Sequence, residues 1–262
     1  MINTRKLANE HGIIPKKSLG QNFLLYETPI FQLIKAANIS KKDIVVEIGP
    51  GLGILTKHLV NSAKKVIAIE KDEKLAEILK GELKDADNLE VVTKDILEWE
   101  PIKEKYKVVG NLPYAIATRI IREFIKRKPE TMTFMVQKEV AFRITAKPPR
   151  MNVLAASIQI YSKPIIVSIV KKDSFWPKPK VDSAIIHISN IKDPKINIDN
   201  FFSVLKAGFL HPRKQLINNI SEGLKINKEE AKKLLLDNNI DSKRRAQTLS
   251  VEDWKELSKG IE

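Results

Sequence analysis

The fold of this 262-residue chain is limited above all by one glycine-rich loop that follows a buried strand. Residues 43–48 form a nearly continuous apolar run, residues 47–53 read Glu-Ile-Gly-Pro-Gly-Leu-Gly, and a helical pattern follows at 54–60. Such a run is typical of a parallel strand that is buried on both faces. Because glycine adopts dihedral angles that other residues resist, we expect a tight turn whose N–H groups can approach a ligand.

Strands and helices alternate along most of the chain. Further strands are predicted at 66–70, 89–93, 107–110, 133–136, 165–170 and 181–189, and helices at 31–37 and 72–83. Alternation at this spacing is typical of βαβ units. We therefore predict an α/β fold with a Rossmann-like, mainly parallel sheet.

The pattern changes after residue 189. A polar, proline-bearing linker at 190–200 is followed by helical segments, with no predicted strand among them, at 201–210, 215–223, 228–237 and 251–259. We therefore expect residues 1–190 to form the Rossmann-like domain, which includes a basic amino-terminal arm, and residues 191–262 to form a small all-helical domain.

Basic residues are concentrated in one stretch of the chain. The formal net charge is +14, and residues 119–180 alone hold 14 basic and 4 acidic side chains. A basic surface attracts a polyanion. We therefore interpret these residues as a binding surface for nucleic acid, in preference to a surface that only makes the protein soluble. Within this stretch, Arg143, Lys147 and Arg150 are our candidates for RNA binding.

The composition excludes several other classes of protein. The absence of cysteine excludes disulfides, thiolate chemistry and cysteine-ligated metals, and four scattered histidines predict no metal site. No apolar run approaches the ~20 residues of a membrane helix, and the amino-terminal residues lack the apolar stretch of a secretory signal. We therefore expect a cytoplasmic protein with no membrane partner, and we expect it to be a monomer.

Two acidic residues accompany the glycine loop. Glu70 ends the strand at 66–70, and Asp95 follows the strand at 89–93. Either acid alone is more often a solvated strand end, but ligands in open α/β sheets bind at the carboxyl ends of the strands. At that edge Glu70 could accept both hydroxyls of a ribose, and Asp95 could accept the amino group of an adenine.

The spacing of the glycines narrows the choice of ligand. Gly49, Gly51 and Gly53 are spaced G-x-G-x-G, whereas the dinucleotide fingerprint is G-x-G-x-x-G, which disfavours a nicotinamide dehydrogenase. A nucleoside without a pyrophosphate fits better. S-adenosylmethionine combines an adenosine for the two acids with an amino-acid tail for the loop at Gly49 and Gly51.

The tetrapeptide Asn111-Leu-Pro-Tyr114 follows the strand at 107–110. The exocyclic nitrogen of adenine is a poor nucleophile because its lone pair is delocalised into the ring. The side-chain oxygen of Asn111 and a nearby backbone carbonyl can accept its two N–H bonds and favour a pyramidal nitrogen, while Tyr114 offers a face for a flipped-out base. Alone, the tetrapeptide could equally be a proline-stiffened strand exit with a buried tyrosine.

With this tetrapeptide the chain resembles the ribosomal RNA adenine N6,N6-dimethyltransferases over nearly its whole length. The boxes that carry the resemblance are the amino-terminal box 16–24 (Lys-Lys-Ser-Leu-Gly-Gln-Asn-Phe-Leu), the methyl-donor loop 46–53, the catalytic box 111–114, and the segments 134–140, 175–184, 211–216 and 244–249. Several boxes in the right order are far more specific than any one of them.

The resemblance implies roles for individual residues. The residues that it assigns to S-adenosylmethionine are Asn22, Leu24, Gly49, Glu70, Asp95 and Asn111. Asn111 and the carbonyl region of Pro113 would hold the target amine, and Tyr114 and Phe175 would sandwich the adenine, although Phe175 on its own pattern is more typical of a core residue. The segments 115–118 and 149–152 depart from the family pattern, which affects the rim and the RNA-facing contacts rather than the donor site.

By the same resemblance, we expect the chain to dimethylate two adjacent adenosines near the 3′ end of small-subunit (16S) ribosomal RNA. Its partner would be the small ribosomal subunit, and residues 191–262 would contribute to RNA binding. Three alternatives stay open: a large-subunit (23S) RNA methylase of the macrolide-resistance type, a DNA adenine methylase, and a non-catalytic ribosome-assembly factor on the same fold. Leu112 and the loop 177–183 argue against the large-subunit methylase, and the lack of a separate base-reading domain argues against the DNA methylase. A non-catalytic factor is disfavoured because Glu70, Asp95 and Asn111 are intact.

Overall fold

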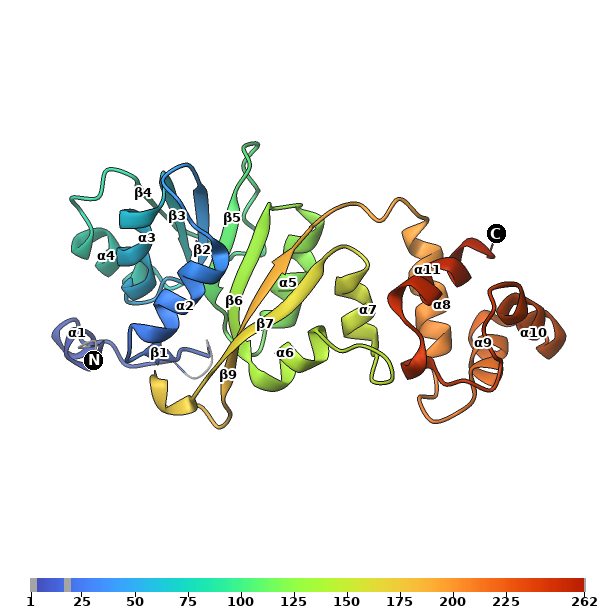
Figure 1. Cartoon of the computed structure of the whole chain (residues 1–262). Helices are drawn as coiled ribbons and strands as arrows, with labels where there is room; N and C mark the ends of the chain where they lie inside the picture. Colours follow the sequence, from blue (N-terminus) through green and yellow to red (C-terminus); the bar gives the residue numbers. More distant parts are fainter. Residues whose placement is uncertain (1–3, 17–19, 262) are drawn as a thin grey trace. The chain divides into compact units, whose positions relative to one another are not determined.

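The computed structural model describes residues 4–16 and 20–261, and the chain divides into two compact units. The first unit comprises residues 1–141 and 163–191, and the second comprises residues 142–162 and 192–262. A seven-stranded sheet forms the centre of the first unit, whereas the second unit is helical (Figure 1). The predicted fold class, a Rossmann-like α/β sheet with a helical carboxy-terminal part, is confirmed.

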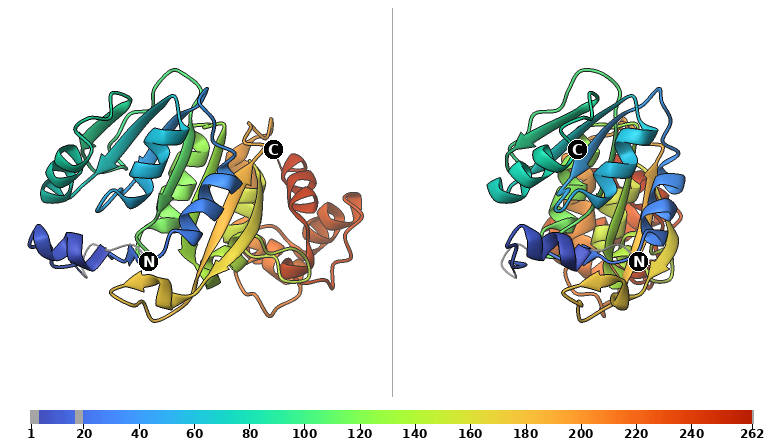
Figure 2. Two further views of the ribbon diagram at one scale, coloured as in Figure 1. Left: turned by 60° about the vertical axis from the view of Figure 1, so that its left-hand side comes forward. Right: turned by 90° about the vertical axis from the view of Figure 1, so that its left-hand side faces the viewer.

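The sheet has the strand order β4-β3-β2-β5-β6-β9-β7. Its strands are β2 (Ile44–Ile48), β3 (Lys65–Glu70), β4 (Leu89–Thr93), β5 (Lys107–Asn111), β6 (Thr131–Gln137), β7 (Lys163–Val170) and β9 (Ser183–Ser189). The strands from β4 to β6 are parallel, whereas β9 runs antiparallel to both β6 and β7. Each strand end lies within two residues of its predicted position, and Figure 2 shows the twist of the sheet.

Helices cover both faces of this sheet. They are α2 (Thr28–Ala37), α3 (Ile54–Ser62), α4 (Glu73–Glu82) and α5 (Ala117–Lys126). The crossovers β2-α3-β3 and β5-α5-β6 proceed in opposite directions from the centre of the sheet, so right-handed connections put α3 and α5 on opposite faces (Figure 1). Ile30 and Leu33 of α2 share an apolar cluster with Leu59 of α3, so α2 covers the same face as α3.

The amino-terminal arm is partly structured. It contains α1 (Thr4–Glu10), and Ala8 and Ile13 pack with Leu75 of α4 in a small apolar cluster. Further on, β1 (Phe23–Leu24) pairs antiparallel with β8 (Phe175–Trp176). Neither α1 nor α5 is predicted from the sequence. Of the amino-terminal box 16–24, residues 17–19 lie outside the described residues.

The point where the strand order reverses positions the functional residues. From β2 the chain passes outward to β3, and from β5 it passes outward to β6 on the other side. The loops after these two central strands therefore leave the sheet toward opposite faces, and a crevice opens between them. The glycine loop follows β2, Glu70 ends β3, Asp95 follows β4 and Asn111 ends β5, so all four meet at this edge.

The second unit has its own core. Its helices are α7 (Val153–Gln159), α8 (Ile198–Gly208), α9 (Leu216–Leu224), α10 (Lys228–Asp237) and α11 (Val251–Lys259), and the division between the units falls within α6 (Lys138–Ile144). Short 3-10 helices lie at Lys172–Ser174 in the first unit and at Ala246–Thr248 in the second. Among the described residues, no helix has the length and the apolar character that crossing a membrane requires.

The boundaries of the units differ in one place from the predicted domains 1–190 and 191–262. The segment 142–162 groups with the carboxy-terminal helices and not with the sheet. The physical reason is that Met151, Ala155 and Ile160 are buried in one cluster with Phe201 and Trp254. A helix from the middle of the chain thus completes the core of the helical unit.

The packing of α8 against α9 can be tested with two glycines, Gly223 and Gly81, each of which is the second-last residue of its helix. A Cβ at Gly223 in α9 would lie 2.5 Å from Cα of Ala207 in α8, whereas a Cβ at Gly81 in α4 would meet nothing within 4 Å. Gly81→Ala should stabilise the protein by about 0.5–1 kcal/mol. Gly223→Ala should instead destabilise it, by about 1–3 kcal/mol, because the helices must move apart. Thermal unfolding of both variants measures the difference in sign, and two shifts of equal sign would contradict the close approach of α8 and α9.

Candidate active site at the carboxyl ends of the parallel strands

A cavity of about 380 Å³ opens at the edge where the central strands end. Its volume lies within the range that is usual for small-molecule sites. Every residue predicted to contact the donor lines this cavity, namely Asn22, Leu24, Gly49, Gly51, Glu70, Asp95 and Asn111. Pro113 and Tyr114 of the catalytic box also line it. The structure therefore brings together one set of residues that the sequence distributes over four strand ends and the amino-terminal box.

The glycine loop has the backbone conformation that its composition predicts. Gly49 and Gly51 have φ angles of 66° and 59°, in the left-handed region that favours glycine. A Cβ at Gly51 would lie 3.1 Å from the ring of Phe23, whereas a Cβ at Gly49 would meet nothing within 4 Å. The loop is therefore packed at Gly51 and open at Gly49, which leaves room for a ligand beside Gly49.

Glu70 ties this loop to the end of β3. Its Oε2 accepts a hydrogen bond from the N–H of Gly51 at 3.1 Å, and its Oε1 accepts one from the N–H of Asp72 at 2.9 Å. Burial raises the pKa of this carboxyl above its ordinary value, although the backbone donors oppose the shift. A carboxylate can accept about four hydrogen bonds, so Glu70 keeps acceptor capacity for a hydroxyl group of a ligand.

Asp95 is held in its ionised form by a neighbouring cation. Its Oδ2 accepts a hydrogen bond from Nζ of Lys71 at 2.8 Å, and its Oδ1 accepts one from the N–H of Leu97 at 3.0 Å. The hydrogen bond from Lys71 holds the pKa of Asp95 below its ordinary value. An ionised carboxylate only accepts hydrogen bonds, which suits the recognition of an amino group.

Asn111 presents its oxygen to the cavity. Its Nδ2 donates a hydrogen bond to the backbone oxygen of Asn22 at 2.9 Å. This contact fixes which end of the amide is the donor, and in the described part of the chain Oδ1 of Asn111 makes no hydrogen bond. The carbonyl of Pro113 accepts from the N–H of Ile116 at 3.2 Å and keeps one lone pair. The two oxygens proposed to accept from a target amine therefore both have acceptor capacity.

Tyr114 is fixed by its hydroxyl group. Its Oη and Oγ of Ser183 lie 2.7 Å apart, and burial raises the pKa of the phenol, so the hydroxyl is neutral. The side chain lines the cavity and is half-buried, so part of its ring can meet a ligand.

Phe175, the second residue of the expected adenine sandwich, is buried beside the cavity lining. Its side chain is 2% exposed, belongs to the apolar cluster with Leu24 and Ile30, and is not among the residues that line the cavity. The reason is the pairing of β1 with β8, in which Phe175 lies opposite Leu24. Of the two residues, Tyr114 lines the cavity, and the sandwich of a flipped adenine between Tyr114 and Phe175 stays a prediction.

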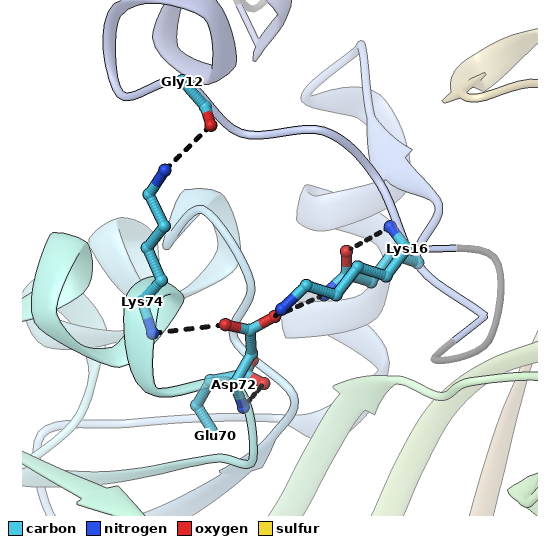
Figure 3. A network of polar contacts seen from close by, with 6 residues as sticks. Gly12, Lys16, Glu70, Asp72 and Lys74 are labelled. Atoms are coloured by element: carbon cyan, nitrogen blue, oxygen red, sulfur yellow. Dashed lines mark hydrogen bonds and ion pairs between the residues drawn. The ribbon is translucent and has the colours of Figure 1, made fainter.

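A network of polar contacts beside the cavity is not predicted from the sequence. Nζ of Lys16 lies 2.6 Å from Oδ2 of Asp72 (Figure 3), and Nε2 of Gln21 lies 3.4 Å from the same oxygen. Asp72 also caps α4, since its Oδ1 accepts from the N–H of Lys74 at 3.2 Å. The signal in the sequence is the position of Asp72, two residues after Glu70 and directly before a helix, where an acidic N-cap is favoured.

The three basic candidates lie in the second unit, at the end of α6 and in the turn that follows it. Arg143 is the second-last residue of α6, and Lys147 and Arg150 follow in a turn that is closed by a hydrogen bond from the N–H of Arg150 to the oxygen of Lys147 at 2.8 Å. Nδ2 of Asn152 donates to the oxygen of Arg143 at 3.0 Å, which holds the loop together. All three side chains are exposed. Their assignment to RNA stays a prediction.

Among the described residues, no three histidine or acidic side chains form a group that could hold a metal ion.

The chain is similar in sequence to proteins that modify ribosomal RNA. The family described as "Ribosomal RNA adenine dimethylase" matches residues 14–257. The chain is 40% identical over 268 residues to the ribosomal RNA small subunit methyltransferase A of Dehalococcoides mccartyi, with 98% of this chain and 92% of that protein covered. It is 39% identical over 269 residues to the protein of the same name from Clostridium botulinum, with 98% of each chain covered.

Solved structures give a concordant result. The structure of the 23S rRNA methyltransferase ErmE has a TM-score of 0.76 and 26% identity, and the likeness covers 90% of this chain and 98% of that one. A dimethyladenosine transferase from Plasmodium falciparum also has a TM-score of 0.76, with 27% identity over 90% of this chain and 95% of that one. Both likenesses cover more of the chain than the first unit alone.

Glu47, a buried acid in the lining of the cavity, is a site residue that is not predicted from the sequence. Its side chain is 1% exposed and its Oε2 has no hydrogen-bond partner among the described residues. Burial, together with the nearby Glu70, raises the pKa of Glu47 from 4.5 to about 8. The signal in the sequence is an acid inside an otherwise apolar central strand.

This pKa makes a prediction about stability. Between pH 4.5 and 8 the unfolded chain releases a proton that the folded chain retains, so the stability due to neutral Glu47 is complete below pH 4.5 and is lost as the pH rises toward 8. Glu47→Gln is neutral at every pH. From pH 5 to 8 the parent should lose stability relative to Glu47→Gln, by up to about 1.4 kcal/mol per pH unit. Urea unfolding at several pH values measures this, and parallel stability curves would show that Glu47 is ionised in the folded protein.

Proposed function

Because this chain belongs to the ribosomal RNA adenine dimethylase family, we propose that it dimethylates N6 of two adjacent adenosines near the 3′ end of small-subunit ribosomal RNA. The methyl donor is S-adenosylmethionine, on which enzymes of this family depend. The small ribosomal subunit is the proposed partner, and the proposed site of action is the cytoplasm, with the protein acting as a monomer. The names of the relatives from Dehalococcoides and Clostridium support the choice of the small subunit.

The observation that carries this proposal is the meeting of four strand ends at one cavity. Glu70 keeps acceptor capacity for a ribose hydroxyl, and ionised Asp95 suits an adenine amino group. The open space beside Gly49 suits the amino-acid tail of the donor. The residues present therefore fit S-adenosylmethionine, and in this proposal Asn22 and Leu24 complete its site.

The charges of the cavity support the same assignment. Glu70 is buried, whereas the cations that line the cavity, Lys71, Lys94 and Arg119, lie nearer to solvent. The donor bears a positive sulfonium, which an acidic interior stabilises. The acceptor is a polyanion, which a cationic rim attracts.

The proposed mechanism rests on the catalytic box. When bound, S-adenosylmethionine supplies an electrophilic methyl group. Oδ1 of Asn111 and the carbonyl of Pro113 accept the N–H bonds of the target amine, which directs the nitrogen lone pair away from the ring. Tyr114 supports the flipped base through its ring. No general base is needed, because the alkylated amine is acidic and loses its proton to water.

The structural likeness to a 23S rRNA methyltransferase supports a second candidate function, that of a large-subunit enzyme with the same donor site. Purified small and large ribosomal subunits, each incubated with labelled S-adenosylmethionine, distinguish the two. We expect dimethyladenosine, identified by mass spectrometry of the nucleosides, in RNA of the small subunit alone. Label in the large subunit would support the second candidate, and label in neither would support a non-catalytic assembly factor.

Asn111→Ala tests the catalytic box. Loss of one preorganised acceptor should lower the single-turnover rate by about 10²–10³-fold. RNA affinity should barely change, because phosphate contacts dominate it. Tyr114→Phe keeps the ring and loses the hydrogen bond to Ser183, so it should have a mild effect and serves as the control. If Asn111→Ala methylates as fast as the parent, the box is only a structural turn.

Reversal of charge at Arg143, Lys147 and Arg150 tests the proposed RNA surface. We expect weaker RNA binding and a flatter dependence of affinity on salt, by about 0.7–0.9 in logarithmic slope for each phosphate that the variant no longer neutralises. Donor affinity should stay the same. The control is the same reversal at Lys41, Lys42 and Lys64, which are exposed in the first unit at the strand ends opposite the cavity. Equal effects of the two triple variants would mean that only net charge matters.

A further inference from the structure

A continuous chain of contacts connects the donor end of the cavity with the catalytic amide through the amino-terminal arm. It begins at Glu70, whose Oε1 accepts from the N–H of Asp72 at 2.9 Å. It continues from Asp72 to Lys16, as Figure 3 shows, and Gln21 contacts the same carboxylate. The chain then runs through the backbone to Asn22, whose carbonyl accepts from Nδ2 of Asn111.

The centre of this chain is an ion pair between Lys16 and Asp72. The side chain of Asp72 is only 6% exposed, whereas that of Lys16 is 55% exposed. Although burial opposes ionisation, the hydrogen bond and the charge of Lys16 hold the pKa of Asp72 below its ordinary value. A buried carboxylate that keeps its charge needs such a partner, since an unpaired one is costly.

Lys16 and Asp72 also fix the position of residues 20–24 of the amino-terminal box. The N–H of Lys16 donates to Oε1 of Gln21 at 2.8 Å, while Nε2 of Gln21 reaches Asp72. Lys16 and Gln21 are thus fixed to each other and to one carboxylate. Gly20, directly before Gln21, lies against the catalytic turn, since a Cβ there would be 3.5 Å from Cβ of Pro113.

We propose that Lys16 and Asp72 are positioning residues for the methyl transfer, because they hold the carbonyl of Asn22 where it orients the amide of Asn111. If the carbonyl of Asn22 moved away, Nδ2 of Asn111 would lose its acceptor. The amide could then turn and offer an N–H instead of Oδ1 to the target amine. This inference rests on the proposed function, and it assigns the arm a role in the rate of transfer.

Other contacts hold the amino-terminal arm in place, so the ion pair between Lys16 and Asp72 is not needed for this purpose alone. Ala8 and Ile13 of the arm are buried against Phe23, Leu52 and Leu75. Nζ of Lys74 donates to the oxygen of Gly12 at 2.8 Å, which is a second polar attachment of the arm to α4. The arm is therefore docked without Lys16. The contribution of Lys16 is confined to the residues directly before Asn22.

Lys16→Met and Lys74→Met form a matched pair. Both remove one ammonium group that joins the arm to its surroundings, but only Lys16 lies on the path to Asn111. At saturating S-adenosylmethionine, Lys16→Met should lower the single-turnover rate by about tenfold, because small misplacements of catalytic groups are costly. Lys74→Met should keep the rate of the parent, and Lys16→Arg should restore most of it.

Three further measurements complete the test. Asp72→Asn should lower the rate about as much as Lys16→Met, and the double variant should be no worse than either, because the two residues act as one pair. Titration calorimetry should show donor affinity changed by less than about threefold in Lys16→Met, since this ion pair is partly exposed and lies outside the cavity. Melting temperatures establish that each variant is folded.

The outcomes separate this inference from the proposed function. If the parent does not methylate ribosomal subunits, the proposed function fails. If the parent is active and Lys16→Met is equally fast, the inference alone is overturned. Equal losses in Lys16→Met and Lys74→Met would also overturn it, because general docking of the arm would then be responsible. A loss of rate that disappears at saturating S-adenosylmethionine would overturn the inference too, because the ion pair between Lys16 and Asp72 would then serve only donor binding.

Discussion

The buried carboxylate of Glu70 is the group on which the rest of the site depends. It accepts one N–H from the glycine loop after β2 and one from the start of the turn after β3, so it joins two loops that leave neighbouring strands. The ring of Phe23 packs on the glycine that donates to it, and Asp72, which also donates to it, caps α4. Because both loops depend on one buried acceptor, a shift in either would leave a polar group unsatisfied, at a cost of about 1–3 kcal/mol.

The electrostatics of the cavity follow from the depth at which each charge lies. Asp95 is ionised by its contact with Lys71, whereas Glu47 is kept neutral by burial beside Glu70. Two acids so close in a desolvated site do not both ionise readily, so neutral Glu47 reduces the repulsion at Glu70. The cations lie at the rim, nearer to solvent. One small cavity therefore presents an acidic interior and a basic entrance, which suits a cationic donor and an anionic acceptor.

The strands and the residues at their ends are well predicted because the information is local. An apolar run, a glycine with a positive φ angle and an acid after a strand each act through their immediate neighbours. Parallel pairing then puts Glu70, Asp95 and Asn111 on one edge. The burial of Phe175 has a different origin, since it depends on pairing with Leu24, far away in the sequence. The grouping of 142–162 with the helical unit likewise depends on apolar contacts with distant residues.

By itself, the sequence determined the fold class, the seven strands of the sheet, and the motifs at the strand ends, because periodicity and dihedral preference are properties of neighbouring residues. The sequence also carried the family resemblance through the order of its boxes. Only the tertiary structure decided which lone pairs stay free, that Oδ1 and not Nδ2 of Asn111 is left to accept from a ligand, and that Lys16 meets Asp72. These features depend on burial and on contacts between segments far apart in the chain, and both exist only once the chain has folded.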